Sequence, residues 1–370
     1  MPRTLPAKPR FLWTQPLNSA GLGGVAATKK FVVVGDRDPA DVMDVFHCYA
    51  AGDGELLWSV RYPSLGKLDY GNTPRATPLI HGGRVYLFGA FGDLHCVELA
   101  SGRIVWKRNL RLEFGARHRL VWGYCSSPLI ADGKLIVNPG APQASVAALD
   151  PLTGKVLWQT PGRPPGFSSF IVGTFGGVRQ VVGYDKDSLG GWNLATGKRL
   201  WKISPRRAGD FNVPTPVQAG DRLFVATENN GARLFGFSPG GRIIPEPIAV
   251  NEDLAPDIAT PLIVNGKVYC VWQELHCLDL TDGLKAKWTA EDESFGPYAA
   301  MIGSESRILI FGNGGAMVLI DARSDKFQVV SRLEVFAGQR AEYYSHPALV
   351  GDRLYLRGPK SLVCLPLPAS

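Results

Sequence analysis

One short pattern recurs along this 370-residue chain. An apolar strand runs into a polar residue, a turn containing Gly follows, and a second strand ends on Trp, as in ALDPLTGKVLW. The period of about 40 to 50 residues is typical of propellers and other repeat arrays. The copies occupy residues 48–58, 96–106, 148–158 and 191–201, with a longer copy at 277–288 and two degenerate copies at 236–244 and 319–329.

Each copy is preceded by two further strand signals. Short runs rich in β-branched and aromatic residues are separated by Asp-Gly, Gly-Lys or Asn-Gly, which indicates tight hairpins. Four strands per unit, repeated radially, form the blade of a β-propeller. We therefore expect an all-β chain without long helices, with about eight blades, or seven if one degenerate unit is a loop. The predicted blades start near Gly24, Ala76, Ser126, Ser168, Pro214, Ala259, Ala299 and Ser345.

The turn Gly and the Trp have different physical roles in this pattern. Gly adopts the positive φ that a tight turn requires. A Trp at a blade edge buries a large apolar area against the next blade and donates its indole N–H to a backbone carbonyl. The predicted structural docking residues are Trp13, Trp58, Trp106, Trp158, Trp201, Trp288, Gly102, Gly154 and Gly197.

The two ends of the chain predict how the ring closes. Residues 11–14 resemble an unpaired outer strand, whereas the last unit has only three strands. We expect the N-terminal strand to complete the last blade, which makes residues 1–370 one propeller domain with a flexible segment at 1–10. The segment 1–10 is basic and Pro-rich, so we expect no signal peptide there. No apolar run approaches the ~20 residues of a membrane span.

The formal net charge of +7 does not predict a nucleic-acid-binding protein. Charged residues make up only 20% of the chain and no nucleic-acid motif accompanies them. We read the basic stretch 108–119 as a surface loop. Three His-Cys dipeptides begin at His47, His95 and His276. Because each Cys occupies the same slot of a different repeat, these side chains cannot converge on one metal ion, and we expect neither a zinc site nor disulfides.

The repeat resembles the tryptophan-docking repeat of the pyrroloquinoline-quinone-like β-propeller family, and the resemblance covers nearly the whole chain. It implies the propeller fold. Dehydrogenases of this family hold pyrroloquinoline quinone and calcium over the channel. They carry a vicinal Cys-Cys pair and long insertions, which this chain lacks. The resemblance therefore favours the non-enzymatic type, similar to the periplasmic propeller lipoprotein that serves outer-membrane assembly as a scaffold.

The candidate binding residues lie on the predicted face around the channel mouth. The connections into each innermost strand, and those between second and third strands, share that face, and loops on a rigid scaffold often carry function. Aromatic and orienting polar side chains suit a polar pocket or an interface. The candidates are Tyr70, Asn72, Arg75, Trp122, Tyr124, Asp185, Asp210, Asn212, Glu228, Asn229, Asp257, Tyr298, Glu342, Tyr343 and His346.

Two subsets of these candidates allow an alternative chemistry. Asp210, Glu228 and Asp257 with Asn212 match the oxygen ligands of calcium, but they are also common turn residues. His346 with Glu342 suits a general base, or a hydrogen-bonded filler of the channel. We assign no catalytic residue and no metal site from these patterns.

The function that we expect is a non-catalytic binding or scaffolding module without a cofactor, whose loop face engages a protein or an extended polar or carbohydrate ligand. The alternative is a quinone- or calcium-dependent oxidoreductase, or a carbohydrate-active enzyme, with its site at the channel mouth. We expect a monomer that binds no nucleic acid. The absence of a signal peptide favours the cytoplasm, whereas the family resemblance favours export.

Overall fold

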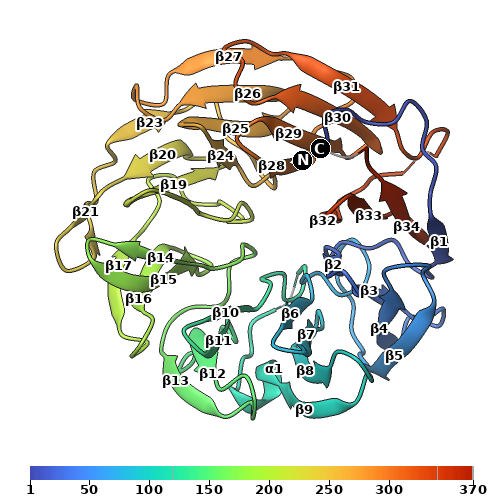
Figure 1. The fold of residues 1–370 in the computed structure, drawn as a ribbon. Coiled ribbons are helices and arrows are strands. Elements are labelled where there is room, and N and C mark those ends of the chain that lie inside the picture. The colour runs from blue at the N-terminus through green and yellow to red at the C-terminus, as the bar shows by residue number, and fades with distance from the viewer. Residues whose placement is uncertain (120, 340, 369–370) are drawn as a thin grey trace.

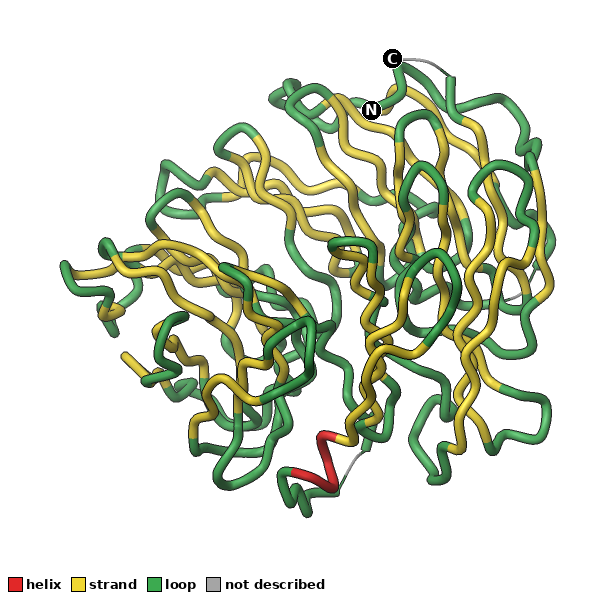
Figure 2. Tube along the Cα trace, turned by 60° about the horizontal axis from the view of Figure 1, so that its bottom comes forward, coloured by secondary structure: helices red, strands yellow, loops and turns green. Residues whose placement is uncertain are grey.

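The computed structural model describes residues 1–119, 121–339 and 341–368. Within them, eight four-stranded antiparallel sheets surround a central channel as the blades of a closed ring (Figure 1). The tube in Figure 2 is almost entirely strand and loop. The predicted all-β propeller is confirmed, and the count is eight blades rather than seven.

The four strands of each blade follow one another from the channel outward, apart from the last blade, whose outer strand comes from the N-terminus. In blade order they are β2 (Ala26–Ala27), β3 (Phe31–Arg37), β4 (Met43–Ala50) and β5 (Leu56–Pro63); β6 (Leu79–His81), β7 (Arg84–Phe88), β8 (Asp93–Glu98) and β9 (Ile104–Asn109); β10 (Leu129–Ala131), β11 (Lys134–Val137), β12 (Val146–Leu149) and β13 (Val156–Thr160); β14 (Ile171–Phe175), β15 (Val178–Tyr184), β16 (Leu189–Asn193) and β17 (Arg199–Ile203); β18 (Val217–Ala219), β19 (Arg222–Thr227), β20 (Gly231–Phe235) and β23 (Ala249–Asn251); β24 (Leu262–Val264), β25 (Lys267–Trp272), β26 (Glu274–Asp279) and β27 (Ala286–Ala290); β28 (Ala299–Gly303), β29 (Arg307–Gly312), β30 (Ala316–Asp321) and β31 (Val329–Glu334); β32 (Ala348–Val350), β33 (Arg353–Arg357), β34 (Ser361–Pro366) and β1 (Trp13–Pro16).

The apolar cores lie between neighbouring blades. In one of them, Val33 and Phe46 of the first blade pack with Val85 and Leu87 of the second. A middle strand is covered by a blade on each side, so both of its faces are buried. This explains why the middle strands are continuous apolar runs rather than alternating ones.

In four blades, the Trp of the repeat docks the blade onto the next one. Trp158 donates its indole N–H to the carbonyl of Leu194 in the following blade at 3.1 Å. A Cβ on Gly197, whose φ is +72°, would lie 2.4 Å from the Trp158 ring, so only Gly allows this approach. The same indole-to-carbonyl bond joins Trp13 to Ala51, Trp58 to Leu99 and Trp106 to Pro151, and Gly102 and Gly154 lie equally close to the rings of Trp58 and Trp106.

Two docking tryptophans deviate from this arrangement. Trp201 donates to the side-chain oxygen of Gln180 in its own blade at 2.7 Å and packs against Phe237. The buried Nε1 of Trp288 has no acceptor among the described residues. The next blades explain the difference, because both lack the Thr-Gly turn. One carries an inserted hairpin at residues 236–244, and the other carries the degenerate copy at 319–329.

The ring closes where the last blade meets the first. Strand β1 pairs antiparallel with β34, with Trp13 opposite Cys364, as predicted (Figure 1). Behind this pairing, the buried Arg357 of β33 lies 3.6 Å from the buried Asp36 carboxylate of β3. Burial by itself raises the pKa of Asp36, but hydrogen bonds from His47, Asn18 and Ser19 outweigh it and lower the pKa to about 2. A charged pair therefore joins the last blade to the first.

The structure places part of the N-terminal segment 1–10 against this ring. Leu5 is buried in the apolar cluster between the last two blades, and its backbone N–H donates to the Ser331 hydroxyl at 2.8 Å.

One expectation about the repeats was wrong. Residues 236–244 do not hold the outer strand of a degenerate repeat; they form a separate hairpin of β21 (Phe237–Ser238) and β22 (Arg242–Ile243). The outer strand of that blade is β23, which follows the hairpin. Phe237 of the hairpin stacks on Phe175 of the preceding blade, so the insertion covers the position where a Thr-Gly turn would otherwise dock.

The basic stretch 108–119 contains a one-turn helix, α1 (Leu110–Glu113), where we expected only loop. The Asn109 side chain accepts from the N–H of Leu112, and Glu113 accepts from the N–H of Asn109. This reciprocal capping explains the turn. A single turn is too short to produce a detectable 3.6-residue period.

Candidate functional site

A belt of hydroxyl groups surrounds the channel at the start of the blades. In five consecutive blades, a Ser or Thr lies two residues before the innermost strand and accepts a hydrogen bond from a backbone N–H of the preceding blade. The acceptors, with distances from donor nitrogen to hydroxyl oxygen, are Thr77 (from Gly24, 3.2 Å), Ser127 (from Thr77, 3.0 Å), Ser169 (from Ser127, 3.0 Å), Thr215 (from Ser169, 3.2 Å) and Thr260 (from Thr215, 3.0 Å).

Sequence reasoning missed this belt. Its signal was present, because four of the five residues stand in a Ser-Pro or Thr-Pro dipeptide that we read only as a strand start. The three remaining blades have no hydroxyl at this place in the channel wall: Gly24 and His346 lie two residues before β2 and β32, and Ala300 lies at the start of β28. The blades that lack it lie next to each other in the ring.

The belt lines a pocket of about 730 Å³ in the channel. This volume lies within the usual range for ligand sites. All eight belt positions line it, together with side chains from the connections into the innermost strands. Eight of the predicted candidates are among these lining residues: Tyr70, Arg75, Trp122, Glu228, Asp257, Tyr298, Tyr343 and His346.

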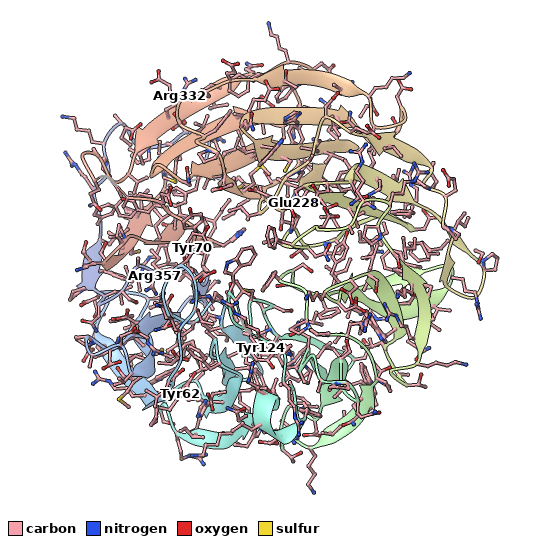
Figure 3. The ribbon with its side chains drawn as sticks, turned by 180° about the vertical axis from the view of Figure 1, so that it is seen from behind. Tyr62, Tyr70, Tyr124, Glu228, Arg332 and Arg357 are labelled. Carbon is pink, nitrogen blue, oxygen red and sulfur yellow. The ribbon has the colours of Figure 1, made fainter. Side chains whose placement is uncertain are left out.

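Aromatic rings form much of the pocket wall. Trp122 lies at the centre of one group, with ring centroids 4.5 Å from Phe167, 4.7 Å from Phe211 and 6.4 Å from Tyr70. Tyr298 and Tyr344 form a second pair, with centroids 5.8 Å apart. Tyr70 is 72% exposed and Phe211 is 51% exposed. Figure 3 shows Tyr70 and Glu228 beside the channel.

Two carboxylates in the wall belong to neighbouring blades. Glu228, after β19, accepts from the backbone N–H of Phe211 at 2.7 Å. Burial raises the pKa of Glu228, and the nearby carboxylates of Asp210 and Asp257 raise it further. Burial likewise raises the pKa of Asp257, which precedes β24. The Oδ1 atom of Asp257 is buried and has no hydrogen-bond partner among the described residues.

His346 lines the wall of the pocket, whereas Glu342 bonds to a different side chain. The His346 side chain is exposed to the lumen, and partial desolvation inside the channel lowers its pKa. The Glu342 carboxylate accepts from the Tyr344 hydroxyl at 2.6 Å, so its hydrogen bond goes to a tyrosine of its own loop. Tyr343 is buried and stacks on Phe336 with ring centroids 4.8 Å apart, at the edge of the pocket.

Three predicted candidates hold the loops together rather than facing the lumen. Asn72 donates to the Asp41 carboxylate and accepts from the N–H of Leu68. Arg75 borders the pocket, but its guanidinium donates to the carbonyls of Thr73, Asp69 and Gly71. Asn212, whose φ is +55°, donates to the carbonyls of Asp185 and Lys186. These side chains hold the rim loops in place and are themselves bonded within the loops.

The other four candidates do not line the pocket. Tyr124 is buried and donates to the carbonyl of Pro139, away from the lumen (Figure 3). Asp185 is buried and forms an ion pair with Arg199 at 3.2 Å. Asp210 accepts from the N–H of Asn229 and from the side chain of Asn230, which fixes the loop beside Glu228.

The residues present do not fit calcium or pyrroloquinoline quinone. No group of three or more His, Cys, Asp or Glu side chains is arranged to hold a metal ion in the part of the chain that the structure describes. Of the four side chains whose oxygens could match calcium, those of Asp210 and Asn212 are engaged within the loops. The quinone is a tricarboxylate and requires cations, but the Arg75 guanidinium already bonds to three carbonyls, and Glu228 and Asp257 would repel the ligand.

The structure also bears on membrane association. Among the described residues, no helix combines the length and apolar character needed to span a bilayer.

Comparison with known proteins gives two groups of relatives. Outer membrane protein assembly factor BamB of Shewanella oneidensis is 26% identical over 310 residues, which cover 76% of this chain and 72% of that protein. Quinohemoprotein alcohol dehydrogenase ADH-IIG of Pseudomonas putida is 22% identical over 197 residues, 46% of this chain but only 26% of the dehydrogenase. The crystal structure of BamB from Moraxella catarrhalis superposes with a TM-score of 0.65 at 15% identity, with 98% of each chain covered. This last likeness concerns the fold.

The family profile described as outer membrane protein assembly factor BamB matches residues 42–290, about two thirds of the chain. The match spans the blades that carry most of the tryptophan-docking repeats. It agrees with the docking geometry and with the resemblance to pyrroloquinoline-quinone-like propellers. This chain belongs to the BamB family of pyrroloquinoline-quinone-like β-propellers.

Proposed function

We propose that this propeller is a non-catalytic scaffold that binds a partner protein at the aromatic mouth of its channel. The observation that carries the proposal is the exposure of Tyr70 and Phe211 on the rim of the 730 Å³ pocket. Large exposed rings over a rigid support are typical of interface hot spots. Relatives named as outer membrane protein assembly factors support a role in that process, and with it an exported location.

The rim is well suited to binding because it is preorganised. Asn72 and Arg75 fix the loop before β6, and Asn212 fixes the loop before β18, through hydrogen bonds to backbone carbonyls or neighbouring side chains. A rigid rim loses little conformational entropy on association. The alternative of a quinone-dependent oxidoreductase is less well supported, because the carboxylates of the wall oppose the anionic cofactor.

Site-specific photo-crosslinking in cells tests the proposal. A benzophenone amino acid placed at Tyr70 or Phe211 should crosslink to a partner protein. The matched control is Leu152, which is 55% exposed in the Thr-Gly turn between β12 and β13 at the opposite end of the strands. Crosslinks from Leu152 with none from Tyr70 or Phe211 would move the binding surface to the other face.

Cell fractionation and hydrodynamic measurements test the remaining parts of the proposal. We expect the chain in the envelope fraction, and we expect the purified protein to sediment as a monomer. Recovery only from the cytoplasm would contradict a role in outer-membrane assembly.

A further inference from the structure

The charges in the pocket wall are unbalanced. Its acidic side chains are Glu228 and Asp257, and its one guanidinium is that of Arg75. Arg75 comes from the connection into β6, whereas the carboxylates come from the blades of β18–β23 and β24–β27. Leaving aside positions 120, 340 and 369–370, neither carboxylate forms an ion pair with the chain. The side of the channel that holds them therefore carries uncompensated negative charge.

These carboxylates also retain unused hydrogen-bonding capacity. A carboxylate offers about four acceptor sites. Glu228 uses one oxygen for the N–H of Phe211, and the buried Oδ1 of Asp257 has no partner among the described residues. Burial and mutual repulsion raise the pKa of Glu228, as expected for a carboxylate that lacks a nearby cation. A ligand that supplies N–H donors and positive charge would satisfy the remaining acceptor sites of Glu228 and neutralise the charge of Asp257 beside it.

The aromatic rings beside the carboxylates favour the same kind of ligand. Phe211 connects the two features directly, since its backbone donates to Glu228 while its ring packs on Trp122. Cations are attracted to the faces of Trp, Tyr and Phe rings, and most strongly to Trp. On the far side of Asp257, Tyr298 extends the aromatic wall, and the carboxylate of Asp257 raises the pKa of its phenol after the effect of burial.

We propose that the pocket binds an arginine or lysine side chain of an extended peptide segment in the partner protein. The cationic head lies between Glu228 and Asp257, and the aliphatic stem packs on Trp122 and Phe211. This inference rests on the proposed function and specifies the chemistry of the partner. A guanidinium supplies a planar set of donors and an apolar stem, which match carboxylates set among rings.

A peptide suits this pocket better than a small free cation. The rings are not closed into a cage, because Tyr70 and Phe211 are largely exposed on the rim. Flanking residues of a bound segment would cover them and remove their apolar surface from water. The pocket volume of about 730 Å³ also exceeds what a single cationic head group fills.

Calorimetric titration of the full-length chain tests the proposal. The probes are the capped peptide Ac-Ala-Phe-Arg-Phe-Ala-amide and its twin with citrulline, a neutral isostere, in place of arginine. We expect the citrulline peptide to bind about tenfold more weakly or worse. Glu228→Gln, which keeps the acceptor for Phe211, should weaken the arginine peptide by about tenfold and leave the citrulline peptide unchanged.

The matched control is Glu55→Gln, which changes an exposed glutamate just before β5 and should leave both affinities unchanged. An unchanged thermal midpoint of Glu228→Gln shows that the variant is folded. Equal binding of the two peptides, or equal affinity of Glu228→Gln and the unaltered chain for the arginine peptide, would overturn the proposal. So would tetramethylammonium binding as tightly as the peptide, because the site would then serve a small organic cation.

The outcome is separable from that of the proposed function. If Tyr70 still crosslinks to a protein while neither peptide binds, the scaffold role stands and the cationic recognition fails. If the arginine peptide binds but Tyr70 and Phe211 capture no protein, the pocket chemistry stands and the protein-scaffold role fails.

Discussion

At the scale of single residues, the molecule depends on a few large side chains that join blades. Trp158 illustrates the arrangement. Its ring packs in the apolar cluster between two blades, its indole N–H bonds to Leu194, and its edge lies against Gly197. The packing, the hydrogen bond and the close approach of Gly197 therefore all involve Trp158. Each of them also requires residues of the next blade.

We expect Trp158→Ala to lower the free energy of unfolding by about 3–5 kcal/mol, because it leaves a cavity between blades. Trp158→Phe retains most of the packing but loses the bond to Leu194, and should cost less, about 1 kcal/mol from that bond. Equilibrium unfolding in denaturant measures both. Equal stability of Trp158→Ala and the unaltered chain would show that the ring does not hold the interface.

At the scale of elements, the hydroxyl belt fixes how neighbouring innermost strands approach the channel. Each hydroxyl satisfies an N–H of the preceding blade at the edge of a sheet, where no further strand is available to pair. An unpaired N–H at that position loses part of its hydrogen bonding. Five hydroxyls of the belt therefore each supply an acceptor for a backbone N–H just before an innermost strand.

Replacement of Thr215 by Val removes one acceptor from the belt with little change in volume. We expect a loss of about 1 kcal/mol, since water in the lumen replaces part of the lost bond. The backbone amide of Ser169, which donates to Thr215, should exchange its hydrogen faster. Thr215→Ser keeps the hydroxyl and should leave this exchange rate unchanged. Unaltered exchange in Thr215→Val would argue against the bond.

At the scale of the whole molecule, the closure of the ring combines strand pairing with a buried charge. Strand β1 pairs with β34, and Arg357 donates to the carbonyl of Ser19 while facing the carboxylate of Asp36. Both side chains are almost fully buried. Separation of the first and last blades would therefore break a pair of charges as well as an apolar core.

We expect Arg357→Met to destabilise the ring by about 3–5 kcal/mol, because it leaves the buried Asp36 carboxylate without its cation. Addition of Asp36→Asn should recover part of this loss, since the double variant buries no unpaired charge. Unfolding of the two single variants and the double variant measures the coupling. Strictly additive losses would show that the two side chains do not stabilise closure as a pair.

The repeat was enough to determine the architecture from the sequence. Each copy carries its own strands, its turn and its Trp, so local patterns sufficed for the blades, the docking residues and the strand that closes the ring. At residues 236–244, where the pattern is weak, the prediction of a degenerate repeat from local sequence was wrong. A hairpin inserted before β23 has the same local signals as a pair of blade strands.

The candidate site could be predicted only in part from the sequence, because the orientation of its polar side chains depends on hydrogen-bond partners that are distant in the sequence. Tyr70 and Asn72 come from one loop and have similar local signals, yet one faces solvent at the rim and the other bonds inward to Asp41. The partner of Glu228 is 17 residues away, at Phe211.

The sequence by itself determined the fold, because blade formation depends on patterns within some 50 residues. Only the tertiary structure decided which loop residues face the channel, which hydroxyls form the belt and which charges close the ring. Each of these assignments requires two blades to be in contact. Arg357 and Gly35, for example, are joined across 322 positions of the chain, a pairing that no local pattern encodes.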